Sequence, residues 1–150
     1  MDLEKLMEKR NTGFIKELGI KQEIVEPGHA IASLEIRPEF ANPIGSTHGG
    51  VIFSLADTVG GAAASSRGRW PTTLSSTINY LSPAMNCKEL IGESREIKTG
   101  KTTGVYGVTI KNEFGKKIAD VTITYYYLAE ISDASADASA DIAKAKAERR

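Results

Sequence analysis

Residues 42–57 read Asn-Pro-Ile-Gly-Ser-Thr-His-Gly-Gly-Val-Ile-Phe-Ser-Leu-Ala-Asp, and this stretch decides the fold. Apolar residues recur after His48 at helical spacing, so we predict one long central helix from His48 to about Ser66. The hydroxyl of Thr47 is placed to cap its first turn. The apolar side of this helix holds Val51, Ile52, Leu55, Ala56 and Val59.

Extended segments flank the central helix on both sides. Before it, the segments from Leu18 to Val25 and from His29 to Ile36 surround a Pro-Gly turn and predict a hairpin. After it, four segments rich in threonine, valine, isoleucine and tyrosine predict consecutive antiparallel strands. These segments are 72–81, 88–98, 103–111 and 117–128, and a short amphipathic helix over residues 2 to about 11 begins the chain.

An antiparallel sheet of about six strands needs a layer that covers its apolar face. The central helix is the one candidate of adequate length, so the sequence predicts the α+β class, with residues 1–128 as one domain. In residues 129–150 the unit Ala-Ser-Ala-Asp at 134–137 repeats at 138–141, and an alanine, lysine and arginine stretch follows. This composition, almost without bulky apolar side chains, predicts a solvated low-complexity tail that can be partly helical and has no role in chemistry.

Composition and charge exclude several classes of function. The chain of 150 residues is 41% hydrophobic and 25% charged, which is typical of a soluble globular domain. Lysine plus arginine and aspartate plus glutamate both number 19, so no large single-sign field favours nucleic acid or an acidic membrane. The most apolar stretch, 51–64, is too short to cross a bilayer, and residues 1–10 alternate acids and bases. We expect a cytoplasmic protein that binds neither nucleic acid nor membrane.

Metal and thiol chemistry are disfavoured by the residue counts. Cys87 is the single cysteine, so no internal disulfide and no cysteine-rich metal site can form. With His29 and His48 as the two histidines, a structural metal site would need several carboxylates, and we expect no metal. No base is placed beside Cys87 by spacing, and His29, in a hairpin strand, is expected to be structural.

Two glycines stand in the first turn of the central helix, where each costs up to ~1 kcal/mol relative to alanine. Without Cβ atoms, Gly49 and Gly50 allow close approach to the unpaired N–H groups of that turn, and the helix dipole adds partial positive charge. Such a turn suits a carbonyl oxygen that becomes an oxyanion during acyl transfer. The alternative is that the two glycines only let the helix pack tightly on the sheet.

One carboxylate, Asp57, interrupts the apolar helix. A buried carboxylate is costly unless it is hydrogen-bonded, so Asp57 predicts a chemical role; the alternative is a solvent-facing residue. Gly49 and Asp57 are eight residues apart, or about 12 Å along a helix, and cannot both touch one carbonyl group. If both act on the substrate, each site must combine the helix start of one subunit with the aspartate of another, as a two-fold dimer does twice.

These residues and two later motifs resemble the hotdog-fold acyl-CoA thioesterases, most of all those of the phenylacetate-pathway type. The resemblance covers roughly residues 13–128. It implies a curved antiparallel sheet wrapped around one central helix, homodimers joined edge to edge that often pair into homotetramers, and an acyl-CoA substrate. The motifs are Asn42, His48-Gly49-Gly50, Asp57, Asn79-Tyr80-Leu81-Ser82-Pro83 and Gly100-Lys101-Thr102-Thr103.

The resemblance also implies residue roles. The N–H of Gly49 would bind the thioester carbonyl, with Asn42 of the same chain helping to polarise it. The partner subunit's Asp57 would act as nucleophile or as general base on water. Thr73 matches the position of a serine or threonine that holds the attacking water. His48 lies too near the oxyanion to serve both ends of the reaction, so we predict that it anchors the loop through a hydrogen bond involving Asn42.

Coenzyme A ends in phosphates, which need cationic partners. Arg67 and Arg69 follow the central helix, and Lys98 and Lys101 flank a turn that resembles the family's nucleotide-contacting loop. We predict that these four bind CoA, although each can also be an ordinary solubilising charge. CoA is part of the substrate, so no separate cofactor is expected, and no P-loop motif indicates ATP chemistry.

The sequence therefore predicts hydrolysis of aryl- or medium-chain acyl-CoA thioesters to the free acid and CoA. One alternative is a hotdog dehydratase or hydratase of 3-hydroxyacyl or enoyl thioesters, in which a histidine and a carboxylate transfer protons. His48 belongs instead to a helix-start motif typical of hydrolases. A second alternative is a non-catalytic acyl-CoA-binding module, against which the joint presence of Asn42, Gly49, Asp57 and Thr73 argues.

Overall fold

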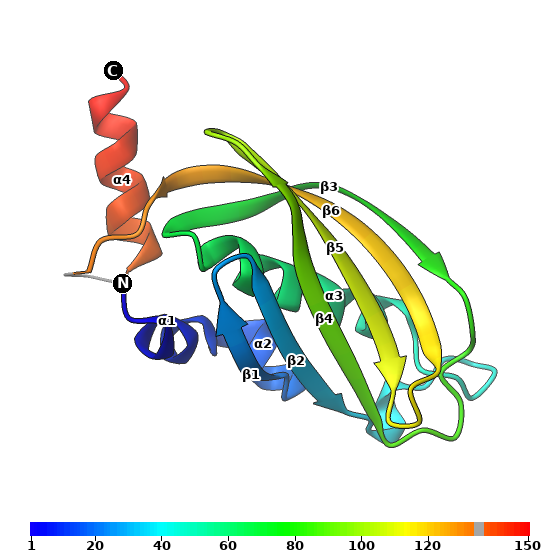
Figure 1. Cartoon of the computed structure of the whole chain (residues 1–150). Coiled ribbons are helices and arrows are strands. Elements are labelled where there is room, and N and C mark those ends of the chain that lie inside the picture. The colour runs from blue at the N-terminus through cyan, green and yellow to red at the C-terminus, as the bar shows by residue number, and fades with distance from the viewer. Residues whose placement is uncertain (134–136) are drawn as a thin grey trace.

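The computed structural model describes residues 1–133 and 137–150. A curved antiparallel sheet of six strands wraps around the central helix α3 (Gly49–Ser65) (Figure 1). The strands are β1 (Lys21–Glu26), β2 (His29–Glu35), β3 (Arg69–Tyr80), β4 (Glu89–Thr99), β5 (Thr103–Asn112) and β6 (Lys117–Glu130). The other helices are α1 (Leu3–Arg10), α2 (Gly13–Leu18) and α4 (Ala138–Glu148), with a short 3-10 turn, η1 (Pro38–Phe40). The predicted fold class is confirmed.

The apolar side of α3 forms the centre of the core. Leu55, Ala56 and Val59 have no exposed surface, and Ile52 retains 3%. The helix can lie close to β4 because that strand has a glycine, Gly92, at the contact. A Cβ atom there would lie 3.1 Å from a methyl group of Val59, which is tighter than ordinary packing.

The strand order is β1-β2-β4-β5-β6-β3, so β3 and β1 are the two edges. The four strands after α3 were predicted in their correct places along the chain. They do not all pair in sequence, because β3 lies beside β6 and the chain then passes to the other side of the meander to begin β4. Hydrophobic pattern marks a strand but not its neighbour, and the long-range pairing decides the order.

The predicted extended segment from Leu18 is wrong at its beginning. Residues 13–18 form the helix α2, and β1 begins only at Lys21. Gly19 ends α2 in the left-handed conformation, with a φ of 78°, which is a common way to stop a helix. Ile15 and Leu18 pack against the main core from this helix, so tertiary packing overrides the extended pattern.

Residues 138–148 form a helix, as a partly helical tail allows, but this helix is not solvated on all sides. The helix α4 packs against the end of β6, beside the chain start (Figure 1). Its anchor is Asp141, which is 8% exposed and accepts hydrogen bonds from Trp70 Nε1 at 2.8 Å and from the Ser132 N–H at 3.0 Å. Ile142 joins a small apolar cluster with Trp70. Residues 134–136, in the first Ala-Ser-Ala-Asp unit, lie outside the described residues.

In the described part of the chain, no helix is long and apolar enough to span a membrane.

Candidate active site

The first turn of α3 leaves a backbone donor open. His48 caps the helix, because its Nδ1 accepts a hydrogen bond from the Gly50 N–H at 2.9 Å. The Gly49 N–H has no acceptor within residues 1–133 and 137–150. Since partial positive charge collects at a helix start, this N–H is a suitable donor to an oxyanion.

Two sequence predictions about this turn are wrong. The cap is His48 rather than Thr47, because the helix begins one residue later than predicted. The predicted hydrogen bond between His48 and Asn42 does not form, because the His48 side chain accepts from the Gly50 N–H of the helix instead.

Asn42 and Gly49 lie together in a pocket of about 310 Å³ at the helix start. The Asn42 Oδ1 accepts hydrogen bonds from the N–H groups of Ile44 at 3.1 Å and Ser46 at 3.0 Å, which fixes the loop. Its Nδ2 donates to no other described residue and can therefore serve a ligand. The Tyr80 hydroxyl donates to the Gly49 carbonyl at 2.8 Å, and a Cβ atom on Gly49 would lie 2.9 Å from that hydroxyl.

Asp57 is half-buried, and one of its carboxylate oxygens is held by two hydroxyls. Oδ1 accepts hydrogen bonds from Thr73 Oγ1 at 2.7 Å and from Tyr125 Oη at 3.2 Å. Tyr125 Oη also lies 3.0 Å from the Asp57 carbonyl. Within the described residues, Oδ2 accepts no hydrogen bond. The predicted proximity of Thr73 to Asp57 is confirmed, and Oδ2 is the oxygen left to meet water or substrate.

Tyr125 belongs to this site, although the sequence analysis did not select it. Burial raises the pKa of Tyr125 well above its ordinary value, and the nearby Asp57 carboxylate acts in the same direction, so the phenol stays a donor at neutral pH. A Cβ atom on Gly60 would collide with the Tyr125 hydroxyl, which explains one of the glycines beside Asp57. The available signal was a tyrosine at an inward position of β6, where a buried hydroxyl needs a partner.

Arg10, the last residue of α1, brings a positive charge to the same region. It donates to Ser65 Oγ at 2.8 Å and to the Thr58 carbonyl at 3.5 Å. Burial lowers the pKa of Arg10, while Tyr125 and Asp57 raise it. A Cβ atom on Gly61 would lie 2.8 Å from the guanidinium, so this glycine leaves room for Arg10. Nothing in the sequence of α1 singles out Arg10.

Asp57 lines a pocket of about 260 Å³ that is separate from the one at the helix start. Its apolar wall comes from α2, α3 and β3. One chain therefore holds the open N–H and the carboxylate in different pockets, as their separation of about 12 Å along α3 requires. The apolar wall residues are Phe14, Ile15, Phe53 and Pro71, and the polar lining includes Arg10, Thr73 and Tyr125.

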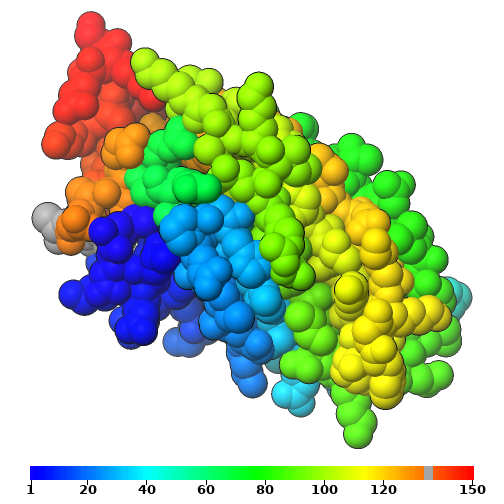
Figure 2. Space-filling view, viewed as in Figure 1, coloured from blue at the N-terminus to red at the C-terminus, as the bar shows by residue number. Residues whose placement is uncertain are grey.

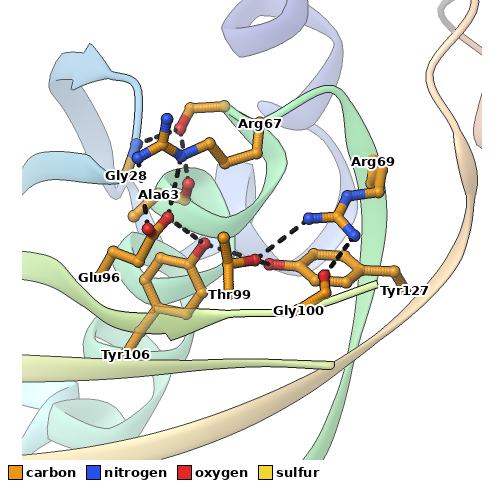
Figure 3. A network of polar contacts seen from close by, with 10 residues as sticks. Gly28, Ala63, Arg67, Arg69, Glu96, Thr99, Gly100, Tyr106 and Tyr127 are labelled. Carbon is orange, nitrogen blue, oxygen red and sulfur yellow. Dashed lines mark hydrogen bonds and ion pairs between the residues drawn. The ribbon is translucent and has the colours of Figure 1, made fainter. Parts of the chain in front are cut away.

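The structure separates the four cations predicted to bind CoA. The Arg67 guanidinium pairs with Glu96 at 2.9 Å (Figure 3). Arg69 and Lys101 line one cleft beside α4, whereas Lys98 is exposed on β4. The pairing of Arg67 with Glu96 raises the pKa of Arg67 and occupies its charge.

Arg69 is held by the turn that joins β4 and β5. Its Nη1 donates to the Gly100 carbonyl at 2.7 Å, and its Nη2 donates to Thr99 Oγ1 at 3.1 Å (Figure 3). Nη1 also donates to the Lys101 carbonyl at 2.9 Å. The guanidinium also stacks 3.7 Å above the centre of the Tyr127 ring. Arg69 therefore fixes the position of this turn as well as carrying a charge.

Two remaining residues from the sequence analysis lie away from both pockets. His29 contacts Glu26 at 3.4 Å and Glu93 at 2.9 Å, which fits a structural role. Burial raises the pKa of the Cys87 thiol, which makes it a poor nucleophile. Among residues 1–133 and 137–150, no three His, Cys, Asp or Glu side chains are grouped to hold a metal ion.

Comparison with known proteins gives consistent matches. Residues 44–119 match the family model of the thioesterase superfamily. The acyl-coenzyme A thioesterase PaaI of Escherichia coli is 33% identical over 109 residues, covering 73% of this chain and 78% of that protein. The structure of E. coli PaaI has a TM-score of 0.78 at 29% identity, over 83% of this chain and 90% of that one. A hypothetical thioesterase protein from Streptococcus pneumoniae with coenzyme A gives 0.78 at 28% identity, over 84% and 99%.

The chain has the hotdog fold, in which a curved six-stranded sheet wraps around a central helix. One pocket lies at the start of this helix and another at its middle. The chain belongs to the thioesterase superfamily and is a thioester hydrolase of the PaaI type. The family, the fold and the class of enzyme predicted from the sequence are confirmed.

Proposed function

We propose that this protein hydrolyses aryl- or medium-chain acyl-CoA thioesters to the free acid and CoA, without metal or prosthetic group. The observation that carries the proposal is the pocket around Asp57. Its carboxylate is held by Thr73 at 2.7 Å beside walls formed by Phe14, Phe53 and Pro71. Such walls suit an aromatic or aliphatic acyl group, and the carboxylate can activate water at its thioester end.

The active site, in this proposal, is shared between two subunits that pair through β3. This strand is twelve residues long, has β6 as its neighbour on one side, and exposes residues 72–77. After Arg69 it carries no charge, and a long uncharged edge is a template for another strand. The opposite edge, β1, has six residues, three of them charged, and a bulge. Two-fold pairing of β3 would set two α3 helices antiparallel, each start facing the other's Asp57.

The proposed reaction uses the polar groups that have no partner among the described residues: Asp57 Oδ2, the Gly49 N–H and Asn42 Nδ2. Water attacks the thioester carbon while its proton passes to Asp57 Oδ2. The carbonyl oxygen takes the negative charge and receives hydrogen bonds from the partner subunit's Gly49 N–H and the partner subunit's Asn42 Nδ2. The C–S bond then breaks, and the leaving thiolate takes the proton from Asp57. Thr73 holds Oδ1 and can accept a hydrogen bond from the attacking water.

A direct attack by Asp57 would instead form a mixed anhydride that water opens. We favour the water route because Oδ1 is fixed by two donors and Thr73 can orient a water beside it. A single turnover in ¹⁸O-labelled water tests for an anhydride that is opened at the aspartyl carbon. The water route leaves Asp57 unlabelled, whereas anhydride formation followed by water attack on the aspartyl carbon labels it.

A panel of acyl-CoA esters with a thiol-detecting reagent tests the proposal. We expect thiol release from benzoyl-, phenylacetyl- and medium-chain acyl-CoA, and its loss in Asp57→Ala. Thiol release from no member of the panel would refute the proposal. With a 3-hydroxyacyl-CoA or enoyl-CoA substrate, a change in enoyl absorbance without thiol release would favour the dehydratase alternative.

A further inference from the structure

A cleft of about 490 Å³ lies between α4 and the turn that joins β4 and β5. In the space-filling view, the red α4 and the yellow-green turn stand beside each other at one end of the molecule (Figure 2). Four basic side chains from three separate segments line this cleft: Arg69, Lys101, Lys144 and Arg149. Lys144 belongs to α4 and Arg149 follows its last residue, so both come from the segment expected to be a solvated tail.

The position of α4 is fixed by buried contacts. Asp141 accepts hydrogen bonds from Trp70 and from the Ser132 N–H, and Ile142 packs on Trp70's cluster. Lys144 follows Asp141 by three residues, and positions three apart share one side of a helix. At the helix end, Arg149 Nη1 donates to Tyr126 Oη at 3.4 Å. The buried contacts of Asp141 and Ile142 therefore hold Lys144 and Arg149 against the end of the sheet.

The opposite wall is equally constrained. Arg69 is stacked on Tyr127 and bonded to the carbonyls of Gly100 and Lys101, so the turn and its lysine are held in place. The acidic side chains lining the cleft are Glu130, Asp141 and Glu148. Asp141 is already occupied by Trp70 and Ser132, so the cations outnumber the carboxylates left to oppose them.

We infer that α4 forms one wall of a phosphate-binding cleft, in which Lys144 and Arg149 bind phosphate groups of the substrate's CoA. This inference rests on the proposed acyl-CoA hydrolysis. Along β3, Arg69 lies four residues from Thr73, or about 13 Å at the ordinary rise of a strand. CoA likewise carries its phosphates far from the thioester, at the other end of the pantetheine arm. Four basic groups on both walls suit phosphate oxygens.

The test compares two thioesters of the same acyl group. One is the CoA thioester, and the other is the N-acetylcysteamine thioester, which has no phosphate. In the Lys144→Met/Arg149→Met double variant, we expect KM for the CoA thioester to rise about tenfold or more, because charge-assisted hydrogen bonds are lost. We expect kcat, and the kinetics with the N-acetylcysteamine thioester, to stay unchanged. Lys146→Met, an exposed lysine of α4 outside the cleft, is the matched control and should change neither.

Equal KM changes for both thioesters, or no change for either, would overturn the inference. Calorimetric binding of CoA provides a second readout that needs no turnover, and the double variant should bind about tenfold more weakly than wild type and Lys146→Met. If wild type hydrolyses neither thioester but binds CoA through α4, the proposed function fails while the cleft stands. If wild type hydrolyses both and the double variant binds CoA normally, the cleft fails alone.

Discussion

The two pockets along α3 are built in different ways. The pocket at the helix start is lined by two short segments, residues 42–52 and 80–84. Its open donors come from the first segment alone, in which His48 caps Gly50 and Asn42 folds back on its own loop. The Asp57 pocket gathers side chains from α1, α2, β3 and β6 around one carboxylate. A site made of local backbone can be read from a short motif, whereas one made of distant side chains depends on the whole fold.

The largest decrease in kcat is expected from a change at Asp57, the carboxylate at the centre of the mid-helix pocket. Asp57→Asn keeps the acceptor for Thr73 and Tyr125 but removes the base, so kcat should fall by about 10³-fold, within the range of general base catalysis. Thermal unfolding should stay close to wild type. Thiol release at near wild-type rate would remove Asp57 from the mechanism.

The second-largest decrease in kcat is expected from a change at Asn42, in the pocket at the start of α3. Asn42→Asp keeps the oxygen that accepts the Ile44 and Ser46 N–H groups and removes the Nδ2 donor. We expect kcat to fall about 10²-fold, as for other oxyanion donors, with the loop intact. Asn42→Ala also loses the loop hydrogen bonds and should unfold more easily by about 1–3 kcal/mol. If Asn42→Asp retains full activity, Nδ2 does not meet the substrate.

Thr73→Val tests the hydrogen bond to Asp57, because it removes one donor to Oδ1 and changes the side-chain volume little. Loss of one hydrogen bond to a charged group corresponds to about a tenfold decrease in kcat. Thr72→Val, at the exposed neighbouring position, is the control and should behave as wild type. Equal kcat values for the two variants would show that the Thr73 hydroxyl is dispensable.

The smallest effect is expected at Arg10, the most remote contributor to the Asp57 pocket. Arg10→Met removes the bonds to Ser65 and the Thr58 carbonyl, and we expect the free energy of unfolding to fall by about 1–3 kcal/mol. Arg10→Lys, which keeps the charge, should lose less. Denaturant unfolding measures both variants, and equal losses would mean that packing rather than charge holds α1.

Much of this architecture could be predicted because it is local. The apolar stripe of α3, the strand-forming segments and the glycine pair at Gly49 are each visible within a few residues. The failures concern long-range contacts. The partner of β3, the burial of Asp141 against Trp70, and the reach of Arg10 to Ser65 depend on residues 39 or more positions apart. The helix α2 was missed because three apolar side chains within six residues give little pattern.

Subunit complementation tests the shared site most directly. Asp57→Asn and Asn42→Asp chains, each nearly inactive alone, are unfolded together and refolded as a mixture. In a mixed dimer, one of the two sites combines an intact Asn42 and Gly49 from one chain with an intact Asp57 from the other. With random pairing, the account predicts recovery of about a quarter of wild-type activity. Activity that stays at the average of the two variants, in a mixture shown to contain mixed dimers, would contradict a site built from two chains.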